Sequence, residues 1–134
     1  MTDTLKAARI LLENQSGTIQ ERETAIHQLS QNPTDEDIRR FVAALEDNDF
    51  GVRWAAAVAL AEAGDRALPP LLRALIDRPN SVWLRQGAHH IFHYSNGPTV
   101  RQHAAEFMAA TKGPAAELST EQVAARLKRI MKMT

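Results

Sequence analysis

Apolar residues recur along this chain at the three- and four-residue spacing of amphipathic helices. The first segment, roughly residues 3–14, places Leu5, Ala8 and Leu12 on one face. The same spacing predicts seven further helices, which begin near residues 18, 34, 50, 68, 81, 98 and 119. No segment shows the apolar–polar alternation of a half-buried strand. The pattern therefore predicts an all-α fold of about eight helices.

Residues typical of helix ends support these boundaries. Thr18 and Glu21 have the spacing of a capping box at the start of the second helix. Gly113-Pro114 interrupts the chain before the last helix, where Ser119 and Gln122 repeat the capping pattern. The helices are thus expected to be joined by short connections.

Three of the expected helices share one sequence pattern, Arg-x-x-Ala-x-x-x-Leu. It begins at Arg22, recurs at Arg53 after 31 residues, and returns at Arg85 after 32 more, with Phe92 in the place of the leucine. The apolar stripes of the helices that follow these three align as well, at intervals of 30 and 32 residues. Such a period predicts a stack of helix pairs, in which each pair buries its apolar face against its neighbours.

The predicted architecture is a single domain over residues 1–134, a right-handed α-α superhelix. It contains three full helical pairs and a terminal half-repeat at each end. The expected repeats are 18–47, 49–78 and 80–111, and the helices at 1–16 and 118–132 are expected to cover the two ends.

The stretch from Leu45 to Asp65, with its Val-Arg-x-x-Ala-Ala-x-Ala-Leu pattern, resembles a HEAT repeat of the short bacterial kind related to bilin-lyase HEAT-like repeats. The likeness covers about residues 18–111 and implies an α-solenoid. Scaffolds, adaptors, chaperone-like lyases and a few enzymes share this fold, so the resemblance does not define one activity. It also implies a ladder of ion pairs between units, and Asp47 and Arg53 match its spacing.

The net charge of zero conceals a division along the chain. Residues 1–65 hold 12 acids and 6 Lys or Arg, whereas residues 66–134 hold 4 acids and 10 Lys or Arg. Sequence order is spatial order in a stack, so one end is expected to be acidic and the other basic. The expected basic surface consists of Arg126, Lys128, Arg129 and Lys132. This division favours nucleic-acid or anion binding as an alternative function, and head-to-tail self-association as a further possibility.

Composition excludes several kinds of chemistry. The chain has no cysteine, which rules out disulfides, thiolate metal sites and cysteine nucleophiles. No apolar run approaches the ~18 residues of a membrane span, and the N-terminal residues do not resemble a signal peptide. We therefore expect a cytoplasmic protein without a membrane segment or cofactor, either monomeric or weakly self-associating.

Four histidines are the main candidates for chemistry. His89 and His93 are four residues apart on one helix and could chelate a metal, while His90 and His103 complete the cluster. A lyase-like or metal-dependent protein using this cluster is a further alternative. Packing is the simpler interpretation, because these positions align with ordinary apolar positions of the repeat. The chain also lacks the His-Glu dipeptides of HEAT-like deoxyhypusine hydroxylases, a glycine-rich phosphate loop and a nucleophile elbow, so catalysis is not favoured.

The leading prediction is a protein–protein interaction scaffold or adaptor. It would present a short concave face formed by the third, fifth and seventh helices. Trp54 aligns with the polar residues Glu23 and Gln86, which predicts a solvent-facing anchor for a partner. The expected partner contacts are Arg40, Ala44, Asp47, Trp54, Arg73, Asp77 and Arg101.

Overall fold

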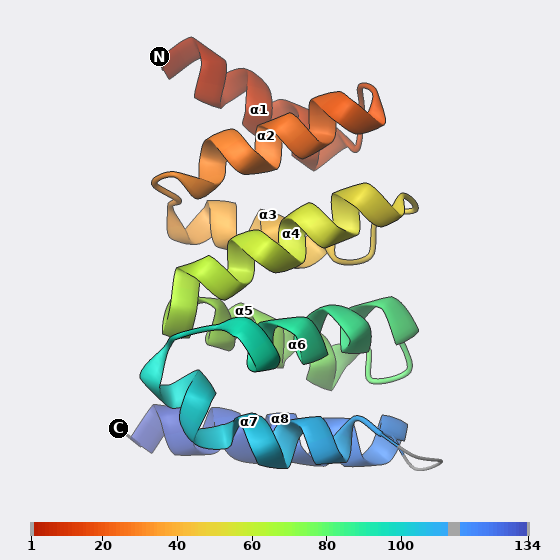
Figure 1. Ribbon diagram of the computed structural model, residues 1–134, viewed down its shortest axis with the longest axis vertical. Coiled ribbons are helices and arrows are strands. Elements are labelled where there is room, and N and C mark those ends of the chain that lie inside the picture. The colour runs from red at the N-terminus through yellow and green to blue at the C-terminus, as the bar shows by residue number, and fades with distance from the viewer. Residues whose placement is uncertain (1, 113–115, 134) are drawn as a thin grey trace.

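The computed structural model describes residues 2–112 and 116–133, which form eight α-helices and a short 3₁₀ helix with no strand (Figure 1). The helices are α1 (Thr2–Asn14), α2 (Ile19–Ser30), α3 (Asp35–Ala44), α4 (Phe50–Ala63), α5 (Leu68–Asp77), α6 (Val82–Tyr94), α7 (Pro98–Ala110) and α8 (Ala116–Met133), and the 3₁₀ helix η1 (Gly64–Ala67) joins α4 to α5. The prediction of an all-α fold with about eight helices is confirmed.

The helices stack in two layers along the long axis of the molecule. The front layer in Figure 1 contains α2, α4, α6 and α7, and the rear layer contains α1, α3, α5 and α8. From α1 to α6 the chain alternates between the layers, and each helix packs against the next member of its own layer. The two ends of the chain lie at opposite ends of the stack (Figure 1). Sequence order is therefore spatial order, as the repeat predicted.

The apolar stripes of both layers form one continuous core. Phe41, Leu60, Leu71 and Phe92 from four successive helices are completely buried. Each such side chain contributes about 1.5–3 kcal/mol relative to an exposed position. Because these contacts join neighbouring helices, the stability of each pair depends on the pairs beside it.

The last two helices depart from the predicted order. We expected α7 to continue the layer of α3 and α5, but α7 packs on α6 in the front layer, and α8 covers α5 instead. The expectation of a face built from α3, α5 and α7 is therefore wrong. The rings of Phe92 in α6 and Phe107 in α7 stack with centroids 4.0 Å apart and hold this arrangement.

Asp65 in η1 fixes the start of α7. The first N–H groups of a helix have no partner within it, and the N-cap residue Gly97 has no side chain to supply one. The Asp65 carboxylate accepts hydrogen bonds from the backbone N–H of Thr99 at 3.0 Å and of Val100 at 3.1 Å. A carboxylate at this position also suits the positive end of the helix dipole. Asp65 thus docks α7 on the corner between α4 and α5.

The predicted helix caps are partly confirmed. Thr18 and Glu21 form the expected capping box. Ser119 does not cap α8, because the helix begins three residues earlier at Ala116 and includes Ser119. The predicted break at Gly113-Pro114 lies outside the described residues.

The buried Asp37 at the start of α3 is the centre of an ion-pair network that joins two helices, α1 and α3. Its carboxylate accepts hydrogen bonds from Nε and Nη2 of Arg9 at 2.9 and 3.1 Å. It also accepts hydrogen bonds from Nη1 of Arg40 at 2.8 Å and from the backbone N–H of Thr34 at 3.0 Å. Burial alone raises the pKa of Asp37, but the hydrogen bonds from Arg9 and Thr34 outweigh burial and lower it from 3.8 to about 2. This network fastens α1 to α3.

Replacing Asp37 by Asn is expected to lower the free energy of unfolding by about 2 kcal/mol at neutral pH, because the charged acceptor of Arg9 is lost. The folded-state pKa of about 2 lies below the unfolded-state value of 3.8. The contribution is therefore complete above about pH 5 and lost as the pH falls toward 2. Urea denaturation at about pH 7 and pH 3 should show a smaller deficit for the variant at the lower pH. An equal deficit at both values would contradict the ion pair.

Replacing Gly97 by Ala is expected to destabilise the protein by about 2 kcal/mol. A Cβ at this position would lie 2.6 Å from the backbone nitrogen of Asp65, which cannot move without displacing the cap of α7. Gly51→Ala is the matched control, because its Cβ would meet the flexible Glu23 carboxylate first. Thermal unfolding should show the loss only for Gly97→Ala, and equal behaviour of the two variants would count against the proposed docking of α7.

Candidate functional site

Four of the seven aromatic residues lie exposed on α4 and α6. The exposed fractions are 67% for Phe50, 52% for Trp54, 39% for Trp83 and 62% for Tyr94. The other three, Phe41, Phe92 and Phe107, belong to the core. We call the four exposed residues the aromatic surface. Large apolar side chains that gather on a surface usually mark an interaction site.

The rings of Phe50, Trp54, His90 and Tyr94 form a continuous row across the two helices. Phe50 and Trp54 are one helical turn apart on α4, with ring centroids at 6.3 Å. Trp54 meets the imidazole of His90 edge-on at 4.7 Å, and His90 in turn contacts Tyr94 at 4.6 Å. These rings do not occupy equivalent positions of the repeat, since Trp54 aligns with Gln86 and His90 aligns with Val58. The row therefore depends on how α4 packs on α6.

A groove of about 290 Å³ lies between α4 and α6 within this surface. Its lining includes the rings of Phe50, Trp54 and Trp83 and the buried side chain of Leu45. Gly87 also lines it, and a Cβ there would lie 2.7 Å from a methyl group of Leu45. The missing side chain at Gly87 therefore allows α6 to pack closely on the end of α3.

Arg53 is the charged residue of the groove lining. Its Nη1 donates to the backbone carbonyl of Asp47 at 2.8 Å. The guanidinium carbon lies 4.2 Å from the centroid of the Trp83 ring and 5.8 Å from that of Phe50. These cation–π contacts hold the guanidinium in place.

His90 is the titratable residue at the centre of the aromatic row. Burial lowers its pKa below the ordinary 6.5, and the nearby His93 and His89 lower it further. Burial, Lys112 and His93 likewise lower the pKa of His89. Both imidazoles are therefore mainly neutral at pH 7.

The histidines do not form a complete metal site. Within residues 2–112 and 116–133, the structure brings no three His, Cys, Asp or Glu side chains together in a way that could hold an ion. The weak candidates His89 and His93 therefore have no third ligand in this part of the chain. His90 is occupied by its ring contacts with Trp54 and Tyr94.

The predicted contacts on the concave face do not form one surface. Ala44 and Asp47 are buried, which corrects the expectation that they meet a partner. Arg40 is bound by Asp37 and Glu13. Arg73 and Asp77 are exposed together on α5. Arg101 lies in the other layer, where it donates to the carbonyls of Phe92 and His93 at the end of α6.

The expected ion-pair ladder between units is present at the seam between α2 and α4. The Asp47 carboxylate binds Arg22 of the preceding unit at 3.3 Å, and Arg53 reaches only the Asp47 carbonyl. At this seam the Asp of one unit thus pairs with the Arg of its neighbour, as a ladder between units requires.

Internal contacts occupy part of the excess positive charge in the C-terminal half. Arg66 binds Asp35, Arg78 binds Glu46 and Arg126 binds Glu106. Lys128 and Arg129 make no ion pair with any described residue. The side chain of Lys132 lies outside the described part of the structure. The basic surface expected on α8 is thus smaller than its sequence indicated.

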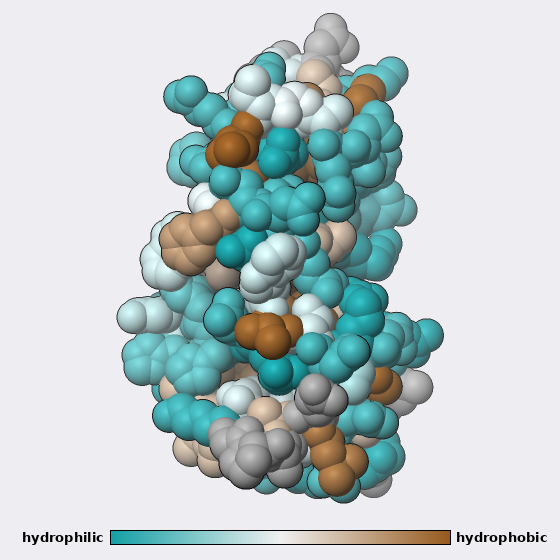
Figure 2. Space-filling view, turned by 90° about the vertical axis from the view of Figure 1, so that its right-hand side faces the viewer, coloured by the Kyte–Doolittle hydropathy of each residue, from teal (hydrophilic) through white to brown (hydrophobic). Residues whose placement is uncertain are grey.

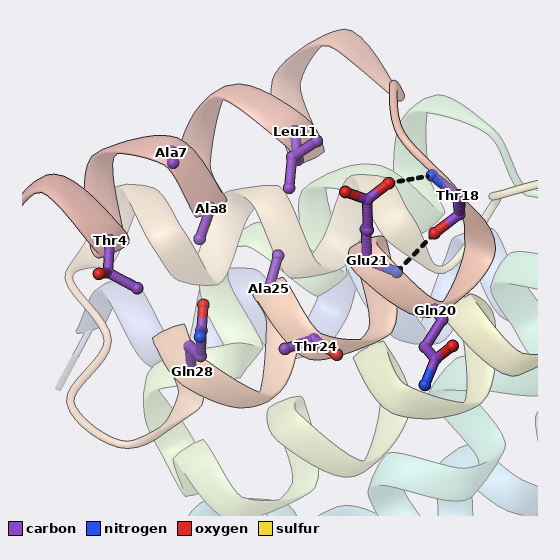
Figure 3. Close-up of a pocket in the computed structure, with 10 residues that line it drawn as sticks. All are labelled: Thr4, Ala7, Ala8, Leu11, Thr18, Gln20, Glu21, Thr24, Ala25 and Gln28. Atoms are coloured by element: carbon purple, nitrogen blue, oxygen red, sulfur yellow. Dashed lines mark hydrogen bonds between the residues drawn. The ribbon is translucent and has the colours of Figure 1, made fainter.

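A wider groove of about 640 Å³ lies between α1 and α2 at the N-terminal end of the stack (Figure 3). Two α2 residues that line it are polar where the aligned residues of α4 and α6 are buried and apolar. Glu21 aligns with Val52 and Leu84, and Gln28 aligns with Ala59 and Ile91. These polar side chains suit contact with water better than contact with a further apolar repeat, as expected at the end of a stack. This groove is therefore the weaker candidate site.

The side of the molecule where α1–α2, α3–α4 and α5–α6 are joined is mostly hydrophilic, with scattered hydrophobic residues (Figure 2). Within the described ranges, no helix has the length and apolar character needed to cross a bilayer. The aromatic surface and its groove are the strongest candidate for a functional site, because exposed aromatic side chains line that groove.

Two layers of helices stacked in sequence order define an α-solenoid, a class of repeat proteins. The chain belongs to the HEAT-repeat family, since the family profile for HEAT repeats matches residues 6–91. The match begins earlier than the expected likeness over 18–111 and ends within α6, before the layer order changes at α7. No curated protein and no solved structure gives a significant match. HEAT repeats generally serve as protein–protein interaction scaffolds.

Sequence reasoning identified Trp54 but missed most of the site around it. Phe50 lies one turn before Trp54, and Tyr94 lies one turn after His90. Each spacing indicates a pair of rings on one helix, but the 32-residue interval aligns Trp54 with Gln86, so the sequence gives no signal for the contact between Trp54 and His90. The contact between Arg53 and Trp83 has no sequence signal either, because it depends on how closely α4 and α6 approach.

His90→Gln is expected to reduce the pH dependence of stability. The pKa of His90 is lower in the folded protein, so the unfolded chain binds the proton more readily as the pH falls through about 6.5. Wild-type stability should therefore decline between about pH 7 and pH 5, and less so in the variant. Urea denaturation at both values measures the difference, with His27→Gln at an exposed position of α2 as the control. Identical slopes for wild type and His90→Gln would contradict this account.

Proposed function

We propose that this protein is an interaction module whose protein partner docks on the aromatic surface between α4 and α6. The observation that carries the proposal is the gathering of three exposed aromatic side chains, Phe50, Trp54 and Trp83, around one groove, with Tyr94 beside it in contact with His90. The family supports the same general role. Leaving these rings in water is unfavourable, and a partner that covers them recovers that free energy.

The composition of the surface suits recognition by a few strong anchors. Trp, Tyr and Arg dominate the residues whose truncation weakens interfaces most, and the aromatic surface has all three types around Trp54. Its rings are already held in place, since Phe50, Trp54 and Tyr94 form a row with His90 and Trp83 contacts Arg53. Binding therefore costs little side-chain entropy. The remainder of the stack acts as the rigid support that holds α4 and α6 at a fixed separation.

A photo-crosslinking residue tests the location of the interface. Gln86 is exposed and lines the groove, whereas Arg73 is exposed on α5 in the rear layer. A crosslinker at position 86 is expected to capture a defined protein in cells, and one at position 73 is not. Equal capture from both positions would contradict the proposed surface.

Trp54→Ala is expected to weaken binding of the captured partner by roughly 30-fold or more, as for a central interface anchor. The control is Leu118→Ala, which removes an exposed apolar side chain on α8, outside the groove lining. Calorimetric titration with the purified partner measures both. Unchanged affinity after Trp54→Ala would show that the partner docks elsewhere.

A further inference from the structure

The three arginines of the repeated pattern make one contact in common. In each, Nη1 donates to a backbone carbonyl in the loop that precedes its own helix. The three pairs are Arg22 with Gly17, Arg53 with Asp47, and Arg85 with Pro79. This contact orients each guanidinium in the same way at the seam between units.

The opposite edge of the guanidinium, formed by Nε and Nη2, binds carboxylates in this protein. Arg22 uses it to hold both oxygens of Asp47 at 3.3 Å. Arg9 uses the same edge to hold both oxygens of Asp37 at 2.9 and 3.1 Å. Two parallel N–H···O bonds of this kind are among the strongest hydrogen bonds in proteins.

In Arg53 this edge has no partner within the described part of the chain. Its Nε and Nη2 make no hydrogen bond or ion pair with any described residue. The reason lies in the next unit, where Pro79 stands six residues before Arg85, in the place that Asp47 occupies six residues before Arg53. The ladder therefore lacks its acid at the seam between α4 and α6.

The open edge lies beside the groove of the aromatic surface. Arg53 and Trp54 both line that groove, and the ring of Trp83 lies over the guanidinium without using its N–H groups. The whole of α6, Val82–Tyr94, contains no acidic residue. A volume of about 290 Å³ is near the lower limit of the ~300–1,000 Å³ typical of small-molecule sites, and it suits a side-chain anchor.

We infer that the groove recognises a peptide segment of the partner in which an Asp or Glu lies next to a large apolar residue. The apolar side chain enters the groove between Trp54 and Gly87. The carboxylate binds Nε and Nη2 of Arg53 and so takes the place of the acid that the ladder lacks at this seam. This inference rests on the proposed function and adds the chemistry of the ligand to it.

The test is a library of random linear peptides selected on the wild-type protein. The peptides are displayed through their C-termini, so that a selected carboxylate must come from a side chain. We expect enriched sequences to pair an acid with an aromatic or large aliphatic residue within two positions. Synthetic peptides with amidated C-termini are then titrated against the variants, with the fluorescence of Trp54 and Trp83 as the readout.

Arg53→Gln is expected to weaken binding of these peptides about tenfold, since it removes the charged guanidinium but leaves the groove in place. Arg53→Lys should also weaken them, because it keeps the charge and loses the two-pronged contact. The matched control is Arg85→Gln, which removes the same loop contact at an arginine outside the groove lining and should leave affinity within twofold. Circular dichroism and urea denaturation establish that each variant is folded.

The outcomes separate the inference from the proposed function. Peptides that require Trp54 but bind Arg53→Gln as tightly as wild type would overturn the inference and leave the proposed surface standing. Peptides that survive Trp54→Ala, or a library with no enrichment, would count against both. Enriched apolar peptides without an acid would also overturn the inference, since the open edge of Arg53 would then have no role.

Discussion

No helix pair of this protein can bury its apolar stripe without a neighbour. Helix α4 shows the constraint, because it packs against α2, α3 and α6 at once and its Val52 and Leu60 are fully buried between them. The need for a neighbour explains the two layers and the order of the helices. It also explains why Glu21 and Gln28 are polar at the N-terminal end of the stack. Burial of apolar surface does not depend on direction, whereas the hydrogen bonds of the repeated arginines do. Each of these arginines donates a hydrogen bond to the loop before its helix, and Arg22 also binds Asp47 of the next unit.

The same constraint explains the irregular C-terminal end. After α6 the rear layer still exposes the apolar face of α5, and α8 covers that face while α7 remains beside α6. Two local contacts decide which helix goes where. Asp65 accepts the first free N–H groups of α7, and Gly97 leaves space for the carboxylate to approach. The stacked rings of Phe92 and Phe107 then hold α7 against α6.

The candidate site is a modification of the repeat at one seam. At the seam between α2 and α4 the carboxylate of Asp47 satisfies the arginine fork. Between α4 and α6 the corresponding residue is Pro79, and aromatic side chains take the place of the polar surface. Arg53, which has no carboxylate partner among the described residues, lies in the lining of an apolar groove and leaves a cationic edge beside it. This is the physical basis for assigning recognition to this seam and not to the larger groove at the N-terminal end.

The sequence by itself determined the helices, their stacking order from α1 to α6, and the exposure of Trp54, because periodic apolar positions and caps act locally and the repeat copies them. Tertiary structure decided the layer of α7, the burial of Asp47, and the partners of Arg53 and His90. Those features depend on which side chains approach one another across a seam. Spacing along the chain does not encode such distances, since a single carboxylate such as Asp65 can redirect a whole helix.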